Sequence, residues 1–340
     1  MRRRTPALCV VVAGLLSIVT AACGGGDTSS TSDAAAASTS STAPTPPAPT
    51  PAPTPAPLAA PLMVQVENSP DARPQSGLGA ADFVYEYETE GGISRFSAFY
   101  LSPPSVQVGP IRSAREATVK LASIYDASLV YSGAVPYIVG QLGVYHDRSI
   151  AETGGPSFRI SSRAAPHNLY TDGKHLTAYD AGVHAAPASY QLWGRTPVSA
   201  LPAGGTPALH ASVDISNFEQ PSFTWDAAAG GYTRTEPTGL LMDGATGKPW
   251  TVPTIVVMQV KVTVGPEVED VSGAHGLDFA VAGTGPVQVM TGGWSFSGTY
   301  AQGSSGPPNF SMASGAGMPI APGGVLLILM RQGNTVRATA

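Results

Sequence analysis

The sequence predicts an α+β protein in which a mixed α/β domain precedes a mostly β, sandwich-like domain. Strand-like and helix-like stretches alternate over residues 62–195. Beyond about residue 208, short apolar stretches recur between Gly-rich turns without helical periodicity. Before residue 62, the composition shifts to Ala, Ser, Thr, Gly and Pro, which is typical of a linker.

The chain has 340 residues and begins with the features of a secretory signal. Residues 2–4 are arginines, an apolar run covers Ala7 to Val19, and small residues 20–22 precede Cys23. An apolar run of about 13 residues is too short to span a bilayer. Small residues directly before a cysteine resemble a lipobox, so we expect residues 1–22 to be a lipoprotein signal peptide.

Acylation of Cys23 would anchor the protein, because two or three acyl chains, such as palmitate, bind stably to a membrane. The alternative is ordinary signal cleavage nearby, which leaves Cys23 as a free thiol. Residues 23–61 then form a disordered Ser/Thr/Pro-rich tether, whose alternating prolines favour extended polyproline II. We therefore expect an extracytoplasmic protein that is lipid-anchored to the bacterial cell membrane.

Charge and cysteine usage exclude several classes of function. The formal net charge is −5, and loss of residues 1–22 leaves 15 basic and 23 acidic residues, a net charge of −8. Nucleic acid is therefore not an expected partner. The other cysteine, Cys9, lies in the signal, so the folded part has neither a disulfide nor a cysteine nucleophile. The six histidines lack zinc-site spacing, and we expect no metal and no cofactor.

The first domain is predicted to span residues 62–200 and to open with a strand over 62–67. Alternation on both sides of Gly91-Gly92 predicts a hairpin with a type I′ turn, because both central residues of that turn need positive φ. A two-residue turn places Glu88 opposite Arg95 and Glu86 opposite Ser97. Glu86, Glu88 and Glu90 would then share a polar face, with aromatic residues on the other.

The stretch "GPIRSARE", residues 109–116, predicts a helix N-terminus. Ser113 and Glu116 have the spacing of a capping box, with Ser113 as the N-cap. Apolar residues recur at helical spacing from Ala114 to Tyr125. Further along, "ASLVYSG" predicts a strand, and residues 135–143 and 172–184 predict helices.

The second domain is predicted over residues 208–335, after a Pro/Gly-rich connection at 195–208. The stretch "SFTWDAAAGGYTRTEPTG" predicts a hairpin. Further strands are expected at "TIVVMQVKVTV", "DFAVAG", "PVQVMTGG", "WSFSGTY" and "GVLLILM".

Arg112 and Arg115 flank the predicted helix start, where free N–H groups and the helix dipole favour an anion. Guanidinium groups are bidentate donors suited to phosphate or carboxylate. Two interpretations stay open. The arginines pair with the acidic hairpin face, which otherwise has only Arg95, or they bind an external anion.

Two further features suggest chemistry. Neighbouring glutamates on a strand lie near the separation that glycoside hydrolysis uses, but any acidic strand face shares that spacing. The loop "RAAPHNLYTD", residues 163–172, brings together Arg163, His167, Asn168 and Tyr170. His167 either acts as a general base or anion ligand, or holds a turn through hydrogen bonds.

Three motifs resemble the family of YerB-like lipoproteins, domain of unknown function 3048, with N- and C-terminal parts. They are "VENSPDARPQSGLGAADFVYEYETEGGISRF", "VGPIRSARE" and "RAAPHNLYT". The resemblance implies a lipoprotein of the bacterial envelope without an established reaction. Together with the motifs above, it gives these candidate ligand-binding residues: Asn68, Arg73, Glu86, Glu90, Arg95, Arg112, Ser113, Arg115, His167 and Asn168.

The sequence therefore predicts a membrane-anchored envelope protein that binds an anionic or sugar-bearing component, such as a phosphate-containing wall polymer, in an Arg/Glu/His groove of the first domain. One alternative is a hydrolase of a cell-wall polymer with a glutamate and His167 as acid and base. Another is a non-catalytic structural or partner-binding protein. Whether the protein is an enzyme stays open.

Overall fold

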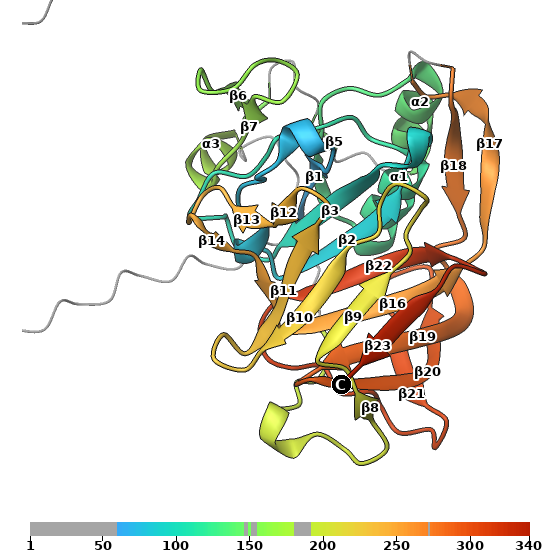
Figure 1. The fold of residues 1–340 in the computed structure, drawn as a ribbon. Helices are drawn as coiled ribbons and strands as arrows, with labels where there is room; N and C mark the ends of the chain where they lie inside the picture. The colour runs from blue at the N-terminus through green and yellow to red at the C-terminus, as the bar shows by residue number, and fades with distance from the viewer. Residues whose placement is uncertain (1–59, 146–148, 151–154, 180–191, 271–272) are drawn as a thin grey trace, which may run out of the picture. The chain divides into compact units, whose positions relative to one another are not determined.

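The computed structural model describes residues 60–145, 149–150, 155–179, 192–270 and 273–340 (Figure 1). The expected signal peptide, Cys23 and nearly all of the tether lie outside the described residues, as does the end of the helix expected over 172–184. The described chain is mostly β with three α-helices, which agrees with an α+β class.

Strands from both predicted domains form one 11-stranded sheet. The first segment contributes β1 (Leu62–Glu67), β2 (Phe83–Glu88), β3 (Ser94–Tyr100), β4 (Ser128–Val130) and β5 (Ser149–Ile150). The second contributes β8 (Thr206–Pro207), β16 (Thr254–Val260), β19 (Gly283–Thr291), β20 (Trp294–Gln302), β21 (Asn309–Met312) and β22 (Val325–Arg331). The strand order is β21-β20-β19-β16-β22-β2-β3-β1-β4-β5, and β8 pairs with β20. The two contributions meet where β2 pairs in parallel with β22.

A six-stranded sheet forms a second layer. It contains β9 (His210–Val213), β10 (Ser222–Asp226), β11 (Gly231–Glu236), β12 (Gly239–Leu240), β15 (Thr251–Val252) and β23 (Val336–Thr339). Three two-stranded ribbons complete the β structure: β6 (Phe158–Arg159) with β7 (Leu169–Tyr170), β13 (Met242–Asp243) with β14 (Lys248–Pro249), and β17 (Val262–Val268) with β18 (His275–Phe279).

The large sheet is covered on both faces, which explains why its strands are apolar on both sides. Tyr85 and Phe99 pack with α1 (Glu116–Tyr125) and α2 (Pro136–Tyr145) in one core. Val84 and Phe96 pack with the six-stranded sheet in another core. The short helix α3 (Gly173–Tyr179) follows β7. Two sheets therefore pack together, but the larger one includes strands of the first segment and so is not part of a sandwich made by the second segment alone.

The β2–β3 register differs by one residue from the expected one. Glu90–Gly92 form a three-residue connection, with Gly91 and Gly92 at φ 74° and 80°, and the Thr89 N–H donates to the Ile93 carbonyl at 2.7 Å. Glu86 consequently lies opposite Phe96, and Tyr87 lies opposite Arg95. A one-residue shift changes which side chains share a face. Glu86 and Arg95 therefore point to opposite faces of the sheet.

Helix α1 begins two residues later than expected. Arg115, not Ser113, is the N-cap residue. The backbone N–H of Arg115 donates a hydrogen bond to the Thr118 hydroxyl at 2.9 Å. The Ser113 carbonyl accepts a bond from Arg95 at 2.6 Å instead. The expected capping box is therefore wrong. The predicted strand in "ASLVYSG" and the predicted helix over 135–143 are confirmed as β4 and α2.

Candidate functional site

The structure distributes the predicted site residues over three ionic clusters. We name each after its central residue. The Glu67 cluster contains Glu67, Ser69, Arg112 and His167. The Arg115 cluster contains Glu90, Arg95, Arg115 and Glu269. The Arg234 cluster contains Arg73, Glu86, Glu219, Arg234 and Glu236.

The Glu67 cluster is built on the last residue of β1. Isolated bridges pair Val66 with Ile111 and Val108 with Thr171, and so bring three loops together there. The Glu67 carboxylate is 3.0 Å from Arg112 Nε and 2.9 Å from His167 Nδ1, and it accepts a hydrogen bond from Ser69 at 2.7 Å.

Exposure within the Glu67 cluster is uneven. The Glu67 side chain is 3% exposed, whereas Arg112 and His167 are 29% and 21% exposed. A buried carboxylate thus orients two groups that solvent still reaches. Glu67 was not among the predicted site residues, although it directly precedes Asn68 in the first family motif.

Arg163 ties the His167 loop to the loop after β1. Its guanidinium donates to the carbonyl oxygens of Asp71, Arg73 and Pro74 at 2.9, 3.1 and 3.0 Å. Asn168 accepts a bond from Arg159 at 2.6 Å within its own loop. Both residues therefore hold the backbone that presents His167.

The Arg115 cluster lies at the N-terminus of α1. Arg115 Nε donates to Glu90 Oε2 at 2.6 Å, and its Nη2 bonds the other Glu90 oxygen. Glu269 Oε2 is 2.8 Å from the same Nε. Arg95 Nη2 lies 3.7 Å from Glu90 Oε1. Of the two interpretations of Arg115, the geometry supports the pairing with the protein's own carboxylates.

Burial sets the electrostatics of the Arg115 cluster. Desolvation, with Arg115 nearby, lowers the pKa of Arg95 to about 10. Desolvation also raises the pKa of Glu269 to about 7, in spite of Arg115. Among the described residues, neither Arg95 Nε nor Glu269 Oε2 has a hydrogen-bond partner.

The Arg234 cluster joins the two segments of the chain. Arg234 Nη2 is 2.8 Å from Glu86 Oε1 and 3.1 Å from Glu219 Oε1. Both Arg234 and Glu86 have fully buried side chains, and the Arg234 guanidinium also lies 5.3 Å from the ring centre of Phe96. Arg73 reaches Glu219 at 3.0 Å and Glu236 at 3.5 Å.

Two guanidinium groups face three carboxylates in this cluster. Desolvation raises the pKa of Glu219 to about 8, although Arg234 opposes it. Burial alone would raise the pKa of Glu236, but Arg234 lowers it overall. Burial and the neighbouring carboxylates thus disfavour the charged form of Glu219, while Arg234 and Arg73 favour it by donating to both of its oxygens.

Asn68 belongs to the same buried network. Its Nδ2 donates to Ser94 at 2.8 Å, and its Oδ1 accepts from Arg73 at 3.2 Å and from Gln75 at 2.7 Å. Glu88, by contrast, pairs with Arg331 at 3.1 Å. The structure therefore separates the three hairpin glutamates, and only Arg112 and His167 meet in the cluster that solvent reaches.

Sequence patterns did not point to four other members of these clusters. Arg234 and Glu236 lie in "YTRTEPTG", where the sequence predicts only a hairpin. Glu219 and Glu269 lie in connections without periodicity. These residues contact the clusters because segments far apart in the sequence lie close together in the fold. No local spacing of residues indicates such contacts.

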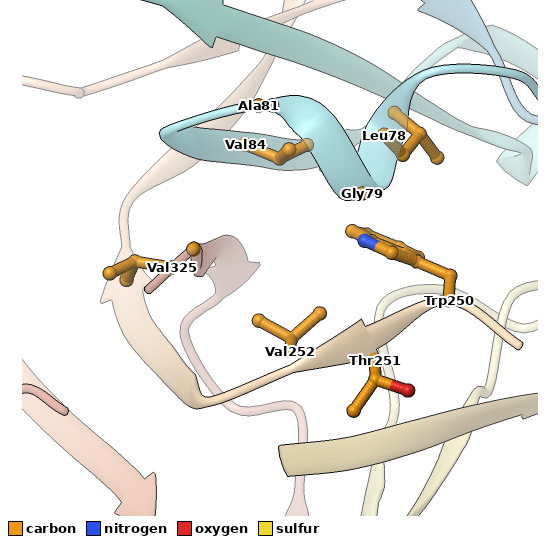
Figure 2. Close-up of a pocket in the computed structure, with 9 residues that line it drawn as sticks. Leu78, Gly79, Ala81, Val84, Trp250, Thr251, Val252 and Val325 are labelled. Atoms are coloured by element: carbon orange, nitrogen blue, oxygen red, sulfur yellow. The ribbon is translucent and has the colours of Figure 1, made fainter. Parts of the chain in front are cut away.

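A small cavity of about 30 Å³ has no cluster residue in its lining, which includes Leu78, Val84, Trp250, Val252 and Val325 (Figure 2). That volume suits about one water molecule. In the described part of the chain, no group of three or more His, Cys, Asp or Glu residues is placed to hold a metal ion. No helix among the described residues is long and apolar enough to cross a membrane.

Comparisons with known proteins agree with the resemblance drawn from the motifs. The model "Protein of unknown function (DUF3048) N-terminal domain" matches residues 50–185, and its C-terminal counterpart matches residues 211–326. "Putative lipoprotein YerB" of Bacillus subtilis (strain 168) is 30% identical over 228 residues, which cover 65% of this chain and 67% of that protein. The crystal structure of YerB from Bacillus subtilis superposes with a TM-score of 0.67 at 25% identity and covers 82% of this chain and 93% of that one.

Proposed function

The chain belongs to the DUF3048 family, and on this premise we propose that it is a lipid-anchored envelope protein that binds an anionic ligand at the Glu67 cluster. The name of the Bacillus subtilis relative describes a lipoprotein, and residues 1–23 of this chain have the pattern of a lipoprotein signal. Acylated Cys23 would hold the folded part outside the cytoplasm, within reach of envelope polymers that bear phosphate.

One observation supports the Glu67 cluster as the ligand site. Arg112 and His167 converge on one buried carboxylate, yet 29% and 21% of their side chains stay exposed. Glu67 lies within 3.0 Å of both groups, and the exposed part of each group can still donate to an oxygen of a ligand. Arg112 offers a planar fork that suits phosphate or carboxylate. Protonated His167 would add a second donor.

The other two clusters favour a non-catalytic protein. Glu86 is fully buried against Arg234, and Glu90 is held by Arg115. The side chains of Glu86 and Glu90 are 0% and 5% exposed and are engaged by guanidinium groups, so neither is placed as the acid or base of a hydrolase. The second candidate function is a structural, partner-binding role, which the extensive internal pairing of charges favours.

The test is a titration of the full-length protein with pyrophosphate, followed by calorimetry and by thermal unfolding. A ligand at 100 times its Kd should stabilise the protein by about 2.7 kcal/mol. We expect Arg112→Gln and His167→Gln to weaken binding by roughly tenfold each, which is the loss of about one charge-assisted hydrogen bond.

Arg337→Gln is the matched control, because Arg337 is an exposed arginine paired with Asp214 at 3.2 Å. It should bind pyrophosphate like the unmodified protein. If no anion stabilises the protein, or if Arg112→Gln and Arg337→Gln bind equally well, the anion-binding function is wrong and the partner-binding role gains.

A further inference from the structure

We propose that Arg95 and Arg115 form a second anion site, distinct from the Glu67 cluster, which Glu269 closes by occupying the position of a ligand's carboxylate or phosphate. Glu90 holds the Nε–Nη2 fork of Arg115, so a small anion would accept a hydrogen bond from Arg95 Nε, which has no partner among the described residues, and would be attracted by the charge of Arg115. Glu269 would then be displaceable, whereas Glu90 would be a permanent part of the site.

The two carboxylates on Arg115 are not equivalent. Glu90 binds through both oxygens, at Nε and Nη2, and comes from the tight β2–β3 connection. Glu269 lies 2.8 Å from Nε, but its Oε2 makes no hydrogen bond with any described residue. A permanent buried ion pair needs hydrogen bonds to offset the desolvation of both charges. Glu269 lacks that compensation at Oε2, the oxygen that faces Arg115.

Arg95 shows the same incomplete pairing from the cationic side. Its side chain is 6% exposed, and its Nε has no partner among the described residues. Its other contacts are the Ser113 carbonyl at 2.6 Å and Glu90 at 3.7 Å. Because burial raises the pKa of Glu269 to about 7, much of this carboxyl is neutral near pH 7. The two guanidinium groups then have surplus positive charge, which favours an incoming anion.

Gly276 provides the space in which the Glu269 carboxyl lies. A Cβ at Gly276 would be 2.3 Å from Glu269 Oε1, so any other residue would expel the carboxyl from its present position. Gly276 lies on β18 and Glu269 directly follows β17, and the ribbon of these two strands lies beside α1 (Figure 1). Phe279 anchors the base of the ribbon in the core, and Val264 and Val268 of its outer part are 68% and 47% exposed. The side chains of Val264 and Val268 therefore do not tie their part of the ribbon to the core.

Two substitutions should open this site by different means. Glu269→Ala removes the carboxylate, whereas Gly276→Ala displaces it and keeps its charge. The full-length variants would be titrated with inorganic phosphate and with glutarate by calorimetry. If the closed form dominates about ten to one, each variant should bind its preferred probe about tenfold more tightly than the unmodified protein. Preference for phosphate or for glutarate identifies the ligand's anionic group, and either preference supports the site.

Glu267→Ala is the matched control, because Glu267 is an exposed carboxylate on β17, two residues before Glu269. It should leave both affinities unchanged, and adding Arg115→Gln to Glu269→Ala should abolish the gain. The proposal is overturned if Glu269→Ala and Gly276→Ala, shown to be folded by circular dichroism, bind no more tightly than Glu267→Ala. Pyrophosphate binding that depends on Arg112 would survive that outcome, so failure of this site and failure of the Glu67 cluster are distinguishable.

Discussion

At the scale of single residues, burial decides what each arginine does. Arg112 keeps 29% of its side chain exposed, Arg115 keeps 10%, and Arg234 keeps none. A guanidinium that solvent reaches can exchange its partner for a ligand. A fully buried one cannot, because the carboxylate it leaves would be an uncompensated charge in a low dielectric.

This difference predicts a large stability loss for Arg234→Met. The substitution fills similar volume but leaves Glu86 with no arginine and Glu236 with only the more distant Arg73. Breaking a buried ion pair from one side costs about 3–5 kcal/mol. Urea unfolding followed by circular dichroism measures this free energy.

Arg337→Met tests whether the loss comes from burial. The Arg337 side chain is 62% exposed in its pair with Asp214, and exposed pairs contribute about 0–1 kcal/mol. If the two variants lose similar stability, Arg234 is not the buried electrostatic centre that its contacts indicate. Should Arg234→Met not fold at all, Arg234→Lys should give an intermediate loss, because it keeps the charge without the fork.

At the scale of elements, the start of α1 depends on Thr118. Its hydroxyl accepts the bond from the Arg115 N–H and lies 2.8 Å from the Tyr87 hydroxyl. Arg115 and its carboxylates are therefore positioned by the same contact that begins the helix. The local pattern around Ser113 could not reveal this, because Tyr87 lies on a strand that precedes it by 26 residues.

Thr118→Val should consequently destabilise the protein by about 1–3 kcal/mol, since it keeps the shape of the side chain and leaves a buried N–H without its acceptor. The midpoint of urea unfolding measures the change. Ser123→Ala, at an exposed position of the same helix, should change the free energy of unfolding by less than about 0.5 kcal/mol. Equal effects would mean that the Thr118 hydroxyl does not support the helix start.

The positions of strands and helices could be predicted because periodicity is a local property of the sequence. β1, β4, α2 and the hairpin of β10 with β11 all coincide with predicted stretches. The β2–β3 register could not be predicted, because one additional residue in the turn changes every cross-strand pair. The partners of Arg234 could not be predicted either, since Glu86 is 148 residues away in sequence.

At the scale of the whole molecule, the two segments depend on each other for their cores. β2 lies between β3 and β22, so half of its backbone pairing comes from the second segment. Val84 and Phe96 of the first segment share a core with Phe223 and Tyr232 of the second. Glu86 lies in the same region and needs Arg234 as its counter-ion. The predicted boundary at 200–208 thus separates stretches of sequence that complete one sheet together.

We therefore expect residues 60–200 and residues 201–340, each produced alone, to lack cooperative unfolding. In the first fragment, β2 would be an unpaired apolar edge strand that carries Glu86 without its counter-ion. Exposed apolar edge strands promote aggregation. Co-production of both fragments should restore a soluble complex, because β2–β22 pairing and the Arg234–Glu86 contact form between them. Size-exclusion chromatography and thermal unfolding measure both expectations, and the same two fragments with Arg234→Met should assemble poorly. A first fragment that is monomeric and unfolds cooperatively by itself would contradict this dependence and establish two independently folding domains.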